Sequence, residues 1–317
     1  MTGLSLFRLR VSDPRTELLA AKADPITGAS ATAGRLVVHV NANDLAASGA
    51  RPTWMLLTAL YPPGTAPAAV AAVGAQVDAA CRELGVALVG GHTELTEAVT
   101  QPVLCGTMLG PLLTRTPVRT GGARPGDRIV LTKGAALEAM AILCDERAEH
   151  LAASGVFESV EQAKAFAEHC SGQISVVPES RVALLDAQLP EGAISSMHDP
   201  TEGGIAGAVH EMADASGRGF RLYVDRIPVA PETQRVADHY QVDVMELISS
   251  GALLLCCDAV HVDGLLGAFE KAGIVAADVG EILDDPQERH GVWGDAPEKP
   301  LTRPEQDALW SCSDDKK

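Results

Sequence analysis

The segment HDPTEGGIAGAVHEMADASG, residues 198–217, decides how the second half of this chain is interpreted. A His-Asp pair and two glycines stand directly before apolar residues that recur at helical spacing, which predicts an α-helix. The segment has two interpretations. It is a tight turn before a helix, or it is a loop whose backbone N–H groups and helix dipole bind a phosphate. Taken alone it favours the turn, because Gly-Gly before a helix is common in α/β proteins.

The composition indicates a folded protein that does not bind nucleic acid. Hydrophobic residues make up 46% of the 317 residues, enough for a substantial core. Aromatic residues make up only 3%, so stacking platforms for nucleic-acid bases are scarce. The net charge of −17 repels phosphate backbones and anionic lipid. A small phosphate-bearing ligand stays compatible with this charge, because a bound Mg²⁺ can invert the local field.

The cysteines and the hydropathy predict a reduced, cytoplasmic protein. The seven cysteines show no CxxC pairing, so we expect buried thiols and no zinc site. The first residues lack the apolar segment of a signal peptide. No apolar run approaches the roughly 18 residues of a membrane span, so no membrane partner is expected.

The first hundred residues are predicted to alternate strands and helices. Runs rich in β-branched residues indicate strands, and alanine-rich periodic runs indicate helices. The pattern is typical of an α/β domain. Strands are predicted at 35–41, 53–61, 85–91 and 102–110, and helices at 43–50 and 67–84.

A second domain of α+β character is predicted after a segment rich in Pro, Gly and Thr. We predict an N-terminal domain over 1–113, a linker over 114–127, a C-terminal domain over 128–285 and a tail over 286–317. The tail is polar and proline-rich, so we expect it to be loosely held. The predicted elements of this half are strands at 128–133, 192–197, 220–224, 251–258 and 276–283, and helices near 135–147, 158–170, 179–187, 204–217 and 262–272.

Four segments place polar side chains near the ends of apolar strands, where open α/β folds build ligand sites. Each also has a structural explanation. Asp44 could cap a helix, Asp24-Pro25 could form a turn, and Gly90-Gly91 could end a strand. The candidate residues are Asp24; Asn41, Asn43 and Asp44; Gly90, Gly91, His92, Thr93 and Glu94; and His198, Asp199, Thr201, Glu202, Gly203 and Gly204.

Taken together, these segments favour a site for a phosphate-bearing ligand. Three separated aspartates supply the oxygen ligands that Mg²⁺ prefers when it bridges to substrate phosphates. Gly203 and Gly204 would let backbone N–H groups approach a phosphate at a helix N-terminus. Neither a Walker A lysine motif nor GxGxxG occurs, so neither a P-loop nor a dinucleotide-binding domain is predicted.

The segments DPITGA, VHVNANDLAASGARP, GGHTELT, GARPGDRIVLTKGAALEAMAIL and HDPTEGG, in this order, resemble the AIR synthetase-like superfamily. That superfamily includes aminoimidazole ribonucleotide synthetase, selenophosphate synthetase, thiamine monophosphate kinase and the carbamoyl dehydratase of hydrogenase maturation. The likeness covers roughly residues 20–283 and is greatest to the AIR synthase-related, hydrogenase-maturation-like branch.

The resemblance implies a PurM-like two-domain fold, α/β plus α+β. Its N-terminal domain forms a barrel-like core in a homodimer, and ATP lies in a cleft between the domains. The implied chemistry is Mg²⁺-dependent phosphorylation of an oxygen of a small-molecule substrate. The roles it implies, together with those argued from the chemistry of the residues, are Asp24, Asp44 and Asp199 as metal ligands; Asn43, Gly90, Gly91, Thr93, Thr201, Gly203, Gly204 and Lys133 as nucleotide-binding residues; and His92, Glu94, His198 and Glu202 as proton-transfer residues.

Three features depart from the family pattern. The family's first acidic motif is replaced by GLSLFRLR, in which Ser5 stands near the missing aspartate, and Asp13 looks like a turn residue. The dehydratase ends in a cysteine that carries the carbamoyl group, whereas Cys312 here is near the end without being terminal. Glu202 stands where that dehydratase usually has arginine.

The function expected from the sequence is an ATP-dependent, Mg²⁺-requiring enzyme that activates a carbonyl or amide oxygen. Two alternatives stay open. One is carbamoyl dehydration of the hydrogenase-maturation type, and the other is a catalytically weakened nucleotide-binding or scaffold protein.

Overall fold

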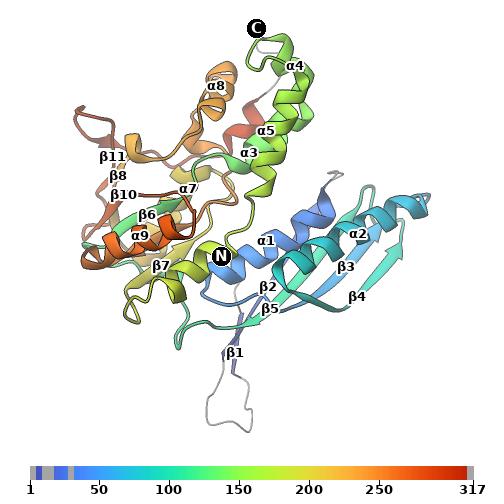
Figure 1. Cartoon of the computed structure of the whole chain (residues 1–317), viewed down its shortest axis with the longest axis horizontal. Helices are drawn as coiled ribbons and strands as arrows, with labels where there is room; N and C mark the ends of the chain where they lie inside the picture. The colour runs from blue at the N-terminus through green and yellow to red at the C-terminus, as the bar shows by residue number, and fades with distance from the viewer. Residues whose placement is uncertain (1–4, 9–17, 28–31, 313–317) are drawn as a thin grey trace. The chain divides into compact units, whose positions relative to one another are not determined.

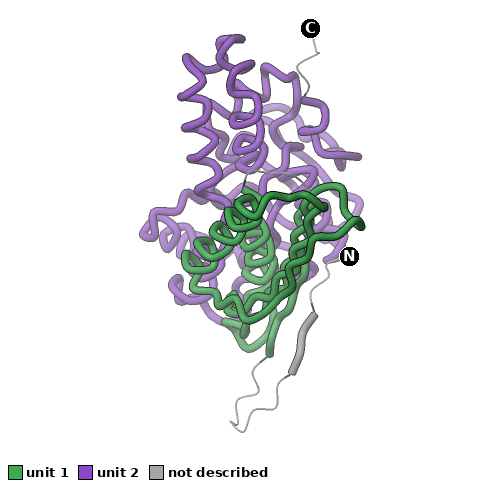
Figure 2. Tube along the Cα trace, turned by 90° about the vertical axis from the view of Figure 1, so that its right-hand side faces the viewer, with its two compact units in different colours: residues 1–117 green, residues 118–317 purple. Residues whose placement is uncertain are grey.

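The protein is described here by a computed structural model that covers residues 5–8, 18–27 and 32–312. Its contacts divide the chain into two compact units, Met1–Pro117 and Val118–Lys317 (Figure 2). Each unit has its own sheet and helices, so each is described by itself.

The first unit is an open five-stranded sheet with two helices that lie together over the strands (Figure 1). The strand order is β1-β2-β5-β3-β4, in which β3 and β4 are parallel and the other pairs are antiparallel. Its elements are β1 Ser5–Arg8, β2 Leu18–Thr27, α1 Ala33–Ala47, β3 Trp54–Tyr61, α2 Pro67–Leu84, β4 Ala87–Leu95 and β5 Val103–Pro111.

Helix α1 replaces a predicted strand. The sequence predicts a strand at 35–41 and a helix only from residue 43, but one helix covers both segments. The strand prediction is wrong because Val38, Ala42 and Leu45 are fully buried at spacings of four and three residues, which is the helical period. The valines suggested a strand, but β-branched residues disfavour a helix only weakly, so the burial of one helical face dominates.

Helix α2 agrees with its sequence signals at both ends. Pro67 occupies the first turn, where its missing N–H leaves no hydrogen bond unmade. Gly85 follows the last turn with a φ of 67°, a left-handed conformation that favours glycine. The predicted helix over 67–84 is confirmed.

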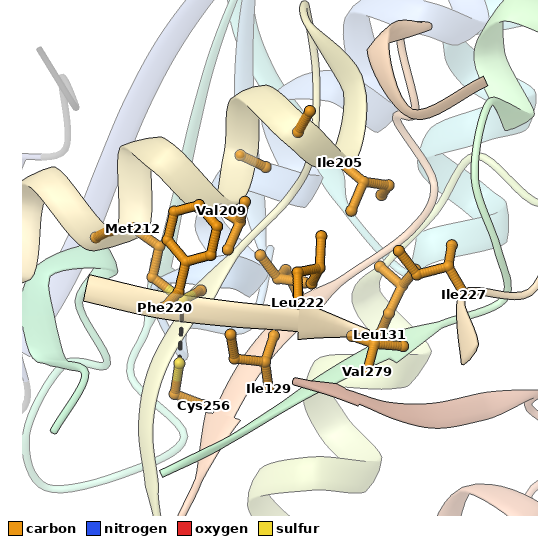
Figure 3. Close-up of a cluster of buried hydrophobic side chains, with 14 of the residues drawn as sticks. Ile129, Leu131, Ile205, Val209, Met212, Phe220, Leu222, Ile227, Cys256 and Val279 are labelled. Atoms are coloured by element: carbon orange, nitrogen blue, oxygen red, sulfur yellow. Dashed lines mark hydrogen bonds between the residues drawn. The ribbon is translucent and has the colours of Figure 1, made fainter. Parts of the chain in front are cut away.

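The second unit contains a seven-stranded sheet whose order is β12-β11-β8-β10-β6-β9-β7. Helix α7 packs on this sheet through Ile205, Val209 and Met212, which meet Phe220 of β8 and Cys256 of β9 (Figure 3). Its elements are β6 Arg128–Thr132, α3 Leu137–Glu146, α4 Ala148–Ala153, α5 Val160–Gly172, α6 Val177–Arg181, β7 Ile194–His198, α7 Gly204–Ser216, β8 Gly219–Tyr223, α8 Pro231–Tyr240, β9 Leu254–Cys257, α9 Val262–Lys271, β10 Ala276–Leu283, β11 Arg289–Val292 and β12 Lys299–Pro300.

The tail is held against the second unit from residue 286 to residue 312, where its description ends, and for this part the prediction that it is loosely held is wrong. Strand β11 pairs in parallel with β8, and β12 pairs with β11. Farther along, Ala308 and Cys312 are buried in a hydrophobic cluster formed by α3, α4, α5 and α8. The polar composition did not predict these contacts, because a few buried residues are enough to hold a mostly polar segment in place.

The seven cysteines, all within the described residues, are free thiols, and six of them are buried. The expectation of buried thiols is therefore confirmed for six of the seven. Among the residues that the structure describes, no helix combines the length and the apolar character that crossing a membrane requires.

Candidate functional site

A compact charged group lies in the first unit where β2 meets α1. The ammonium nitrogen of Lys22 lies 3.2 Å from Oδ2 of Asp24 and 3.1 Å from Oδ2 of Asp44. Burial acts to lower the pKa of Lys22, but attraction and hydrogen bonds to Asp44 and Asp24 outweigh it, so this pKa lies above the usual 10.5. The structure thus brings together two of the three predicted metal ligands, with a lysine between them.

Asn41 fixes the backbone of Asp24 against α1. Its side-chain oxygen accepts the Asp24 N–H at 2.9 Å, and its Nδ2 donates to the Asp24 carbonyl at 3.2 Å. A Cβ on Gly106 would lie 2.6 Å from that Nδ2, so glycine in β5 makes room for the amide. These contacts join β2, β5 and α1 without using either carboxylate.

Both Asp24 and Asp44 lie inside regular elements, which excludes the turn proposed for Asp24 and the helix cap proposed for Asp44. Asp44 is near the C-terminal end of α1 and so does not cap the helix N-terminus. Asp24 lies inside β2 and not in a turn. The neighbouring Asn43 is 1% exposed on α1.

The segment around His92 lies within β4, so Gly90 and Gly91 do not form a strand-end turn. Gly91 serves close strand approach, because a Cβ there would lie 2.0 Å from the carbonyl oxygen of Leu57. His92 and Glu94 are both exposed, with Nε2 and Oε2 3.4 Å apart.

The strand register separates His92 and Glu94 from the charged group. Leu57 pairs with Gly91 and with Gly106, and Gly106 pairs with Asp24. These residues therefore share the face that meets α1. Because successive side chains of a strand point to opposite faces, His92 and Glu94 point to the other face of the sheet, and Thr93 points to the face of Asp24.

The segment HDPTEGG, residues 198–204, forms the connection from the end of β7 to the start of α7 in the second unit. His198 ends β7, and its Nε2 lies 2.7 Å from Oε2 of Glu211 in α7. The hydrogen bond from His198 lowers the pKa of Glu211. Asp199 is 5% exposed, Thr201 is half-buried and Glu202 is exposed.

Gly203 and Gly204 have φ angles of 79° and 60°, which are left-handed conformations. A Cβ on Gly204 would lie 2.5 Å from the carbonyl oxygens of Met245 and Leu247, so glycine is required there. The N–H of Gly204 donates to the Thr201 carbonyl at 3.0 Å. The loop therefore combines the tight turn and the helix start that the sequence indicates.

Asp307 of the tail occupies the glycine loop and was missed by the sequence interpretation. Its carboxylate accepts the N–H of Gly203 at 2.7 Å and that of Leu309 at 2.8 Å, and it is 3% exposed. Both glycine N–H groups are thus used within the protein. No local signal in the polar tail points to this contact, because it joins residues 104 positions apart.

Glu138, in the first turn of α3, is a second residue that the sequence interpretation missed. Desolvation raises the pKa of its carboxyl, and the charges of Asp307, Glu202 and Asp199 add to this, whereas a hydrogen bond with Ser250 opposes it. The second unit therefore gathers carboxyl groups around the start of α7.

Lys133 has contacts that indicate a structural role. Its ammonium lies 2.8 Å from Oε1 of Glu179 and donates to the carbonyls of Gln173, Ser175 and Gly251 at 2.9, 2.6 and 2.8 Å. Four protein oxygens account for all three N–H bonds. These contacts give no support to the prediction that Lys133 neutralises a phosphate.

The candidate residues form separate groups. Asp24 and Asp44 lie together with Lys22 in the first unit, where β4 carries a separate group from Gly90 to Glu94. In the second unit the β7–α7 connection holds His198 to Gly204, and Lys133 lies apart with its own partners. The described residues hold no cluster of three or more metal-ligating side chains of the kind that binds an ion by itself. Ser5 begins β1 opposite Ala21, and Asp13 lies outside the described residues, so the structure describes no side chain that replaces the family's first acidic motif.

Sequence models of both halves of one protein family match this chain. The N-terminal domain of AIR synthase related protein matches residues 10–112, and the C-terminal domain matches residues 124–292. The second match alone covers more than half of the chain. The protein belongs to the AIR synthase related family.

Relatives of known name include carbamoyl dehydratase HypE of Cupriavidus necator, 28% identical over 265 residues that cover 80% of this chain and 68% of that protein. A putative hydrogenase expression/formation protein of Methanocaldococcus jannaschii is 27% identical over 223 residues, and the matched part spans only 61% of its length and 70% of this chain. The selenide, water dikinase of Geobacter metallireducens is 26% identical over 302 residues, which cover 84% of this chain and 80% of that enzyme.

Solved structures share the fold. HypE in complex with ATP has a TM-score of 0.76 at 21% identity, over 95% of this chain and 88% of that one. A ThiL protein with AMPPCP and TMP has a TM-score of 0.72 at 15% identity, over 95% and 89%. At these identities the likeness concerns the fold alone.

Proposed function

We propose that this protein is an ATP-dependent enzyme that phosphorylates a carbonyl or amide oxygen of a small metabolite and forms ADP. The observation that carries the proposal is membership in a family whose relatives include a carbamoyl dehydratase and a selenide, water dikinase. The charged group of the first unit and the β7–α7 connection of the second lie within the segments that match the family.

The reaction suits a site that contributes mainly position and charge. The substrate oxygen attacks the γ-phosphorus, the bond to the bridging oxygen breaks, and ADP leaves with the electron pair. A carbonyl or amide oxygen is a poor leaving group, whereas the phosphorylated oxygen departs as phosphate in a later substitution or elimination. Positioning and charge neutralisation supply most of the acceleration in such transfers.

His198 is the residue best placed to move a proton. Imidazole is a common general acid and base, and the carboxylate of Glu211 at 2.7 Å fixes one nitrogen of this ring. Glu202 is exposed beside it and is the second candidate. His92 and Glu94 are weaker candidates, because they point to the face of the first sheet opposite Asp24.

Magnesium is proposed as the ion that accompanies ATP. Asp24 and Asp44 have the oxygen chemistry that Mg²⁺ prefers. The ammonium of Lys22 lies between their carboxylates, so a metal ion that accompanies ATP must displace this ammonium before it can bind both of them.

Calorimetric titration with ATP and Mg²⁺ tests the proposal. We expect the wild type to bind, and both Asp44→Asn and Asp199→Asn to bind more weakly while keeping their fold. Asp78→Asn and Asp238→Asn, on exposed faces of α2 and α8, are the matched controls. Normal binding by both site variants would show that the site is assigned to the wrong residues, and no binding by the wild type would reject a nucleotide-dependent function.

Carbamoyl dehydration is the second candidate, favoured by the names of several relatives. A carrier role for Cys312 has little support, because this thiol is 5% exposed and lies 3.6 Å from the Ala308 carbonyl. Mass spectrometry after incubation with carbamoyl phosphate and a carbamoyltransferase would detect a modified Cys312. Tight ATP binding without turnover in a panel of amide substrates would instead favour a weakened nucleotide-binding or scaffold protein.

A homodimer through the first unit is also proposed. Strand β4 pairs only with β3 among the described residues, and all nine of its residues are exposed. Leu88, Val89 and Leu95 are 50%, 57% and 57% exposed, which is unusual for an edge strand of a monomer. A second copy would cover them and continue the sheet. Light scattering at micromolar concentration should give twice the mass of one chain, and a monomer would contradict the proposal.

A further inference from the structure

Lys22 contacts Asp24 and Asp44 in the place where two carboxylates would otherwise share a divalent ion. Its ammonium is 3.2 Å from one carboxylate and 3.1 Å from the other, and the side chain is 17% exposed. Carboxylates hold Mg²⁺ or Ca²⁺ at roughly 2.0–2.6 Å. The ammonium is held by longer, charge-assisted hydrogen bonds and supplies one positive charge instead of two.

The relative position of the two aspartates does not depend on Lys22. The backbone of Asp24 is fastened to α1 by the two hydrogen bonds of Asn41. Asp44 belongs to the same helix, one turn beyond Asn41. Removing the ammonium would therefore leave two carboxylates close together without their lysine, and paired carboxylates attract a divalent cation.

We propose that Lys22 is the resident counter-ion of the Asp24–Asp44 pair and excludes divalent cations from it. The ammonium takes the place between the two carboxylates, so a divalent ion must displace it before it can bind both of them. The inference rests on the proposed function for the place of these aspartates in the site. It concerns metal binding without nucleotide, so the two can fail separately.

Titration of the full-length protein with Mn²⁺, followed by the electron paramagnetic resonance signal of the free ion, tests this proposal. Lys22→Met should bind one additional Mn²⁺ per chain, or bind it at least tenfold more tightly than the wild type. Lys22→Gln, whose amide can still donate hydrogen bonds to the carboxylates, is a second variant with the same expected gain and a smaller risk to folding. Lys164→Met, on the exposed face of α5, should behave as the wild type.

The double variant Lys22→Met with Asp44→Asn locates the ion. It should lose the Mn²⁺ that the single variant gains, because one carboxylate is gone. Equal Mn²⁺ binding by the wild type and both Lys22 variants would overturn the proposal, and so would a gain that persists in the double variant. If none of the proteins binds ATP but the Lys22 variants gain Mn²⁺, the proposed function fails and the role of Lys22 stands.

Discussion

Two lysines, one in each unit, are held by carboxylates in opposite ways. Lys22 lies between Asp24 and Asp44, and it donates to no backbone carbonyl in the part of the chain that the structure describes. Lys133 meets one carboxylate, that of Glu179, and three backbone carbonyls. The side chains of Lys22 and Lys133 are similarly exposed, at 17% and 12%. The two lysines therefore differ in their partners and not in how deeply they are buried.

The partners decide what each lysine does. Burial lowers the pKa of Lys133 despite Glu179, whereas Asp44 and Asp24 together raise the pKa of Lys22 against the effect of burial. A buried lysine–carboxylate pair with carbonyl partners holds the loops that supply those carbonyls. Removing one charge of the pair leaves the other charge buried and uncompensated. An ammonium shared by two partly exposed carboxylates is their counter-ion, and it keeps divalent cations away from them while it stays in place.

The largest effect is expected from Lys133→Met. The change leaves the Glu179 carboxylate, 1% exposed, without its lysine and frees three partly buried carbonyls. Breaking one side of a buried pair costs about 3–5 kcal/mol. Urea denaturation followed by circular dichroism should show a loss of this size in the free energy of unfolding.

The double variant Lys133→Met with Glu179→Leu is the control, since it removes both charges and should recover part of the loss. A loss below about 1 kcal/mol in the single variant would place Lys133 among replaceable surface lysines. That result would remove the contrast with Lys22.

The fold was predictable from the sequence where apolar spacing and turn residues agree. Pro67 and Gly85 delimit α2, and the α7 segment after Gly203 carries a clear helical period. The strand prediction for residues 35–41 failed, because the β-branched composition indicates a strand whereas the pattern of burial is that of a helix. The prediction of a loosely held tail failed because the few buried residues of this polar segment do not recur at a helix or strand spacing.

The site was predictable only as far as residue type and segment order reveal chemistry. Asp24 and Asp44 were chosen because carboxylates near strand ends favour cations, and the structure brings them to one lysine. Lys22 itself lies among alanines in the sequence and gave no signal. Asp307 could not be found, because its partner Gly203 is distant in sequence and their hydrogen bond exists only in the folded chain.

An intermediate effect is expected from the thiols of the unit that holds Lys133, where burial again dominates. Burial raises the pKa of Cys144 and of Cys170 from 9.0 to about 12. Because the folded pKa values are raised, the stabilisation is fully present below pH 9 and is lost as the pH rises from 9 toward 12. These two thiols ionise only in the unfolded chain in that range, so they alone should lower the free energy of unfolding by about 2–3 kcal/mol between pH 8 and pH 10.

Urea denaturation at both pH values measures this loss. The matched control is the double variant Cys144→Ala with Cys170→Ala, in which the pH-dependent part of the loss should shrink by that amount. If the free energy of unfolding fell equally between pH 8 and pH 10 in the double variant, other groups of the protein would cause the alkaline loss. The thiols would then give no parallel for the effect of burial on the pKa of Lys133.

The smallest effect is expected from Lys22→Met on stability at pH 7. Its partners Asp24 and Asp44 are 35% and 24% exposed, so water screens both the attraction that is lost and the repulsion that remains. Such partly exposed pairs contribute about 0–1 kcal/mol. The free energy of unfolding should fall by no more than this, and addition of Mn²⁺ should restore it, because the ion replaces the missing charge. A loss of about 3 kcal/mol or more that Mn²⁺ does not reverse would make Lys22 a structural lysine like Lys133, and the two units would then use their lysines in the same way.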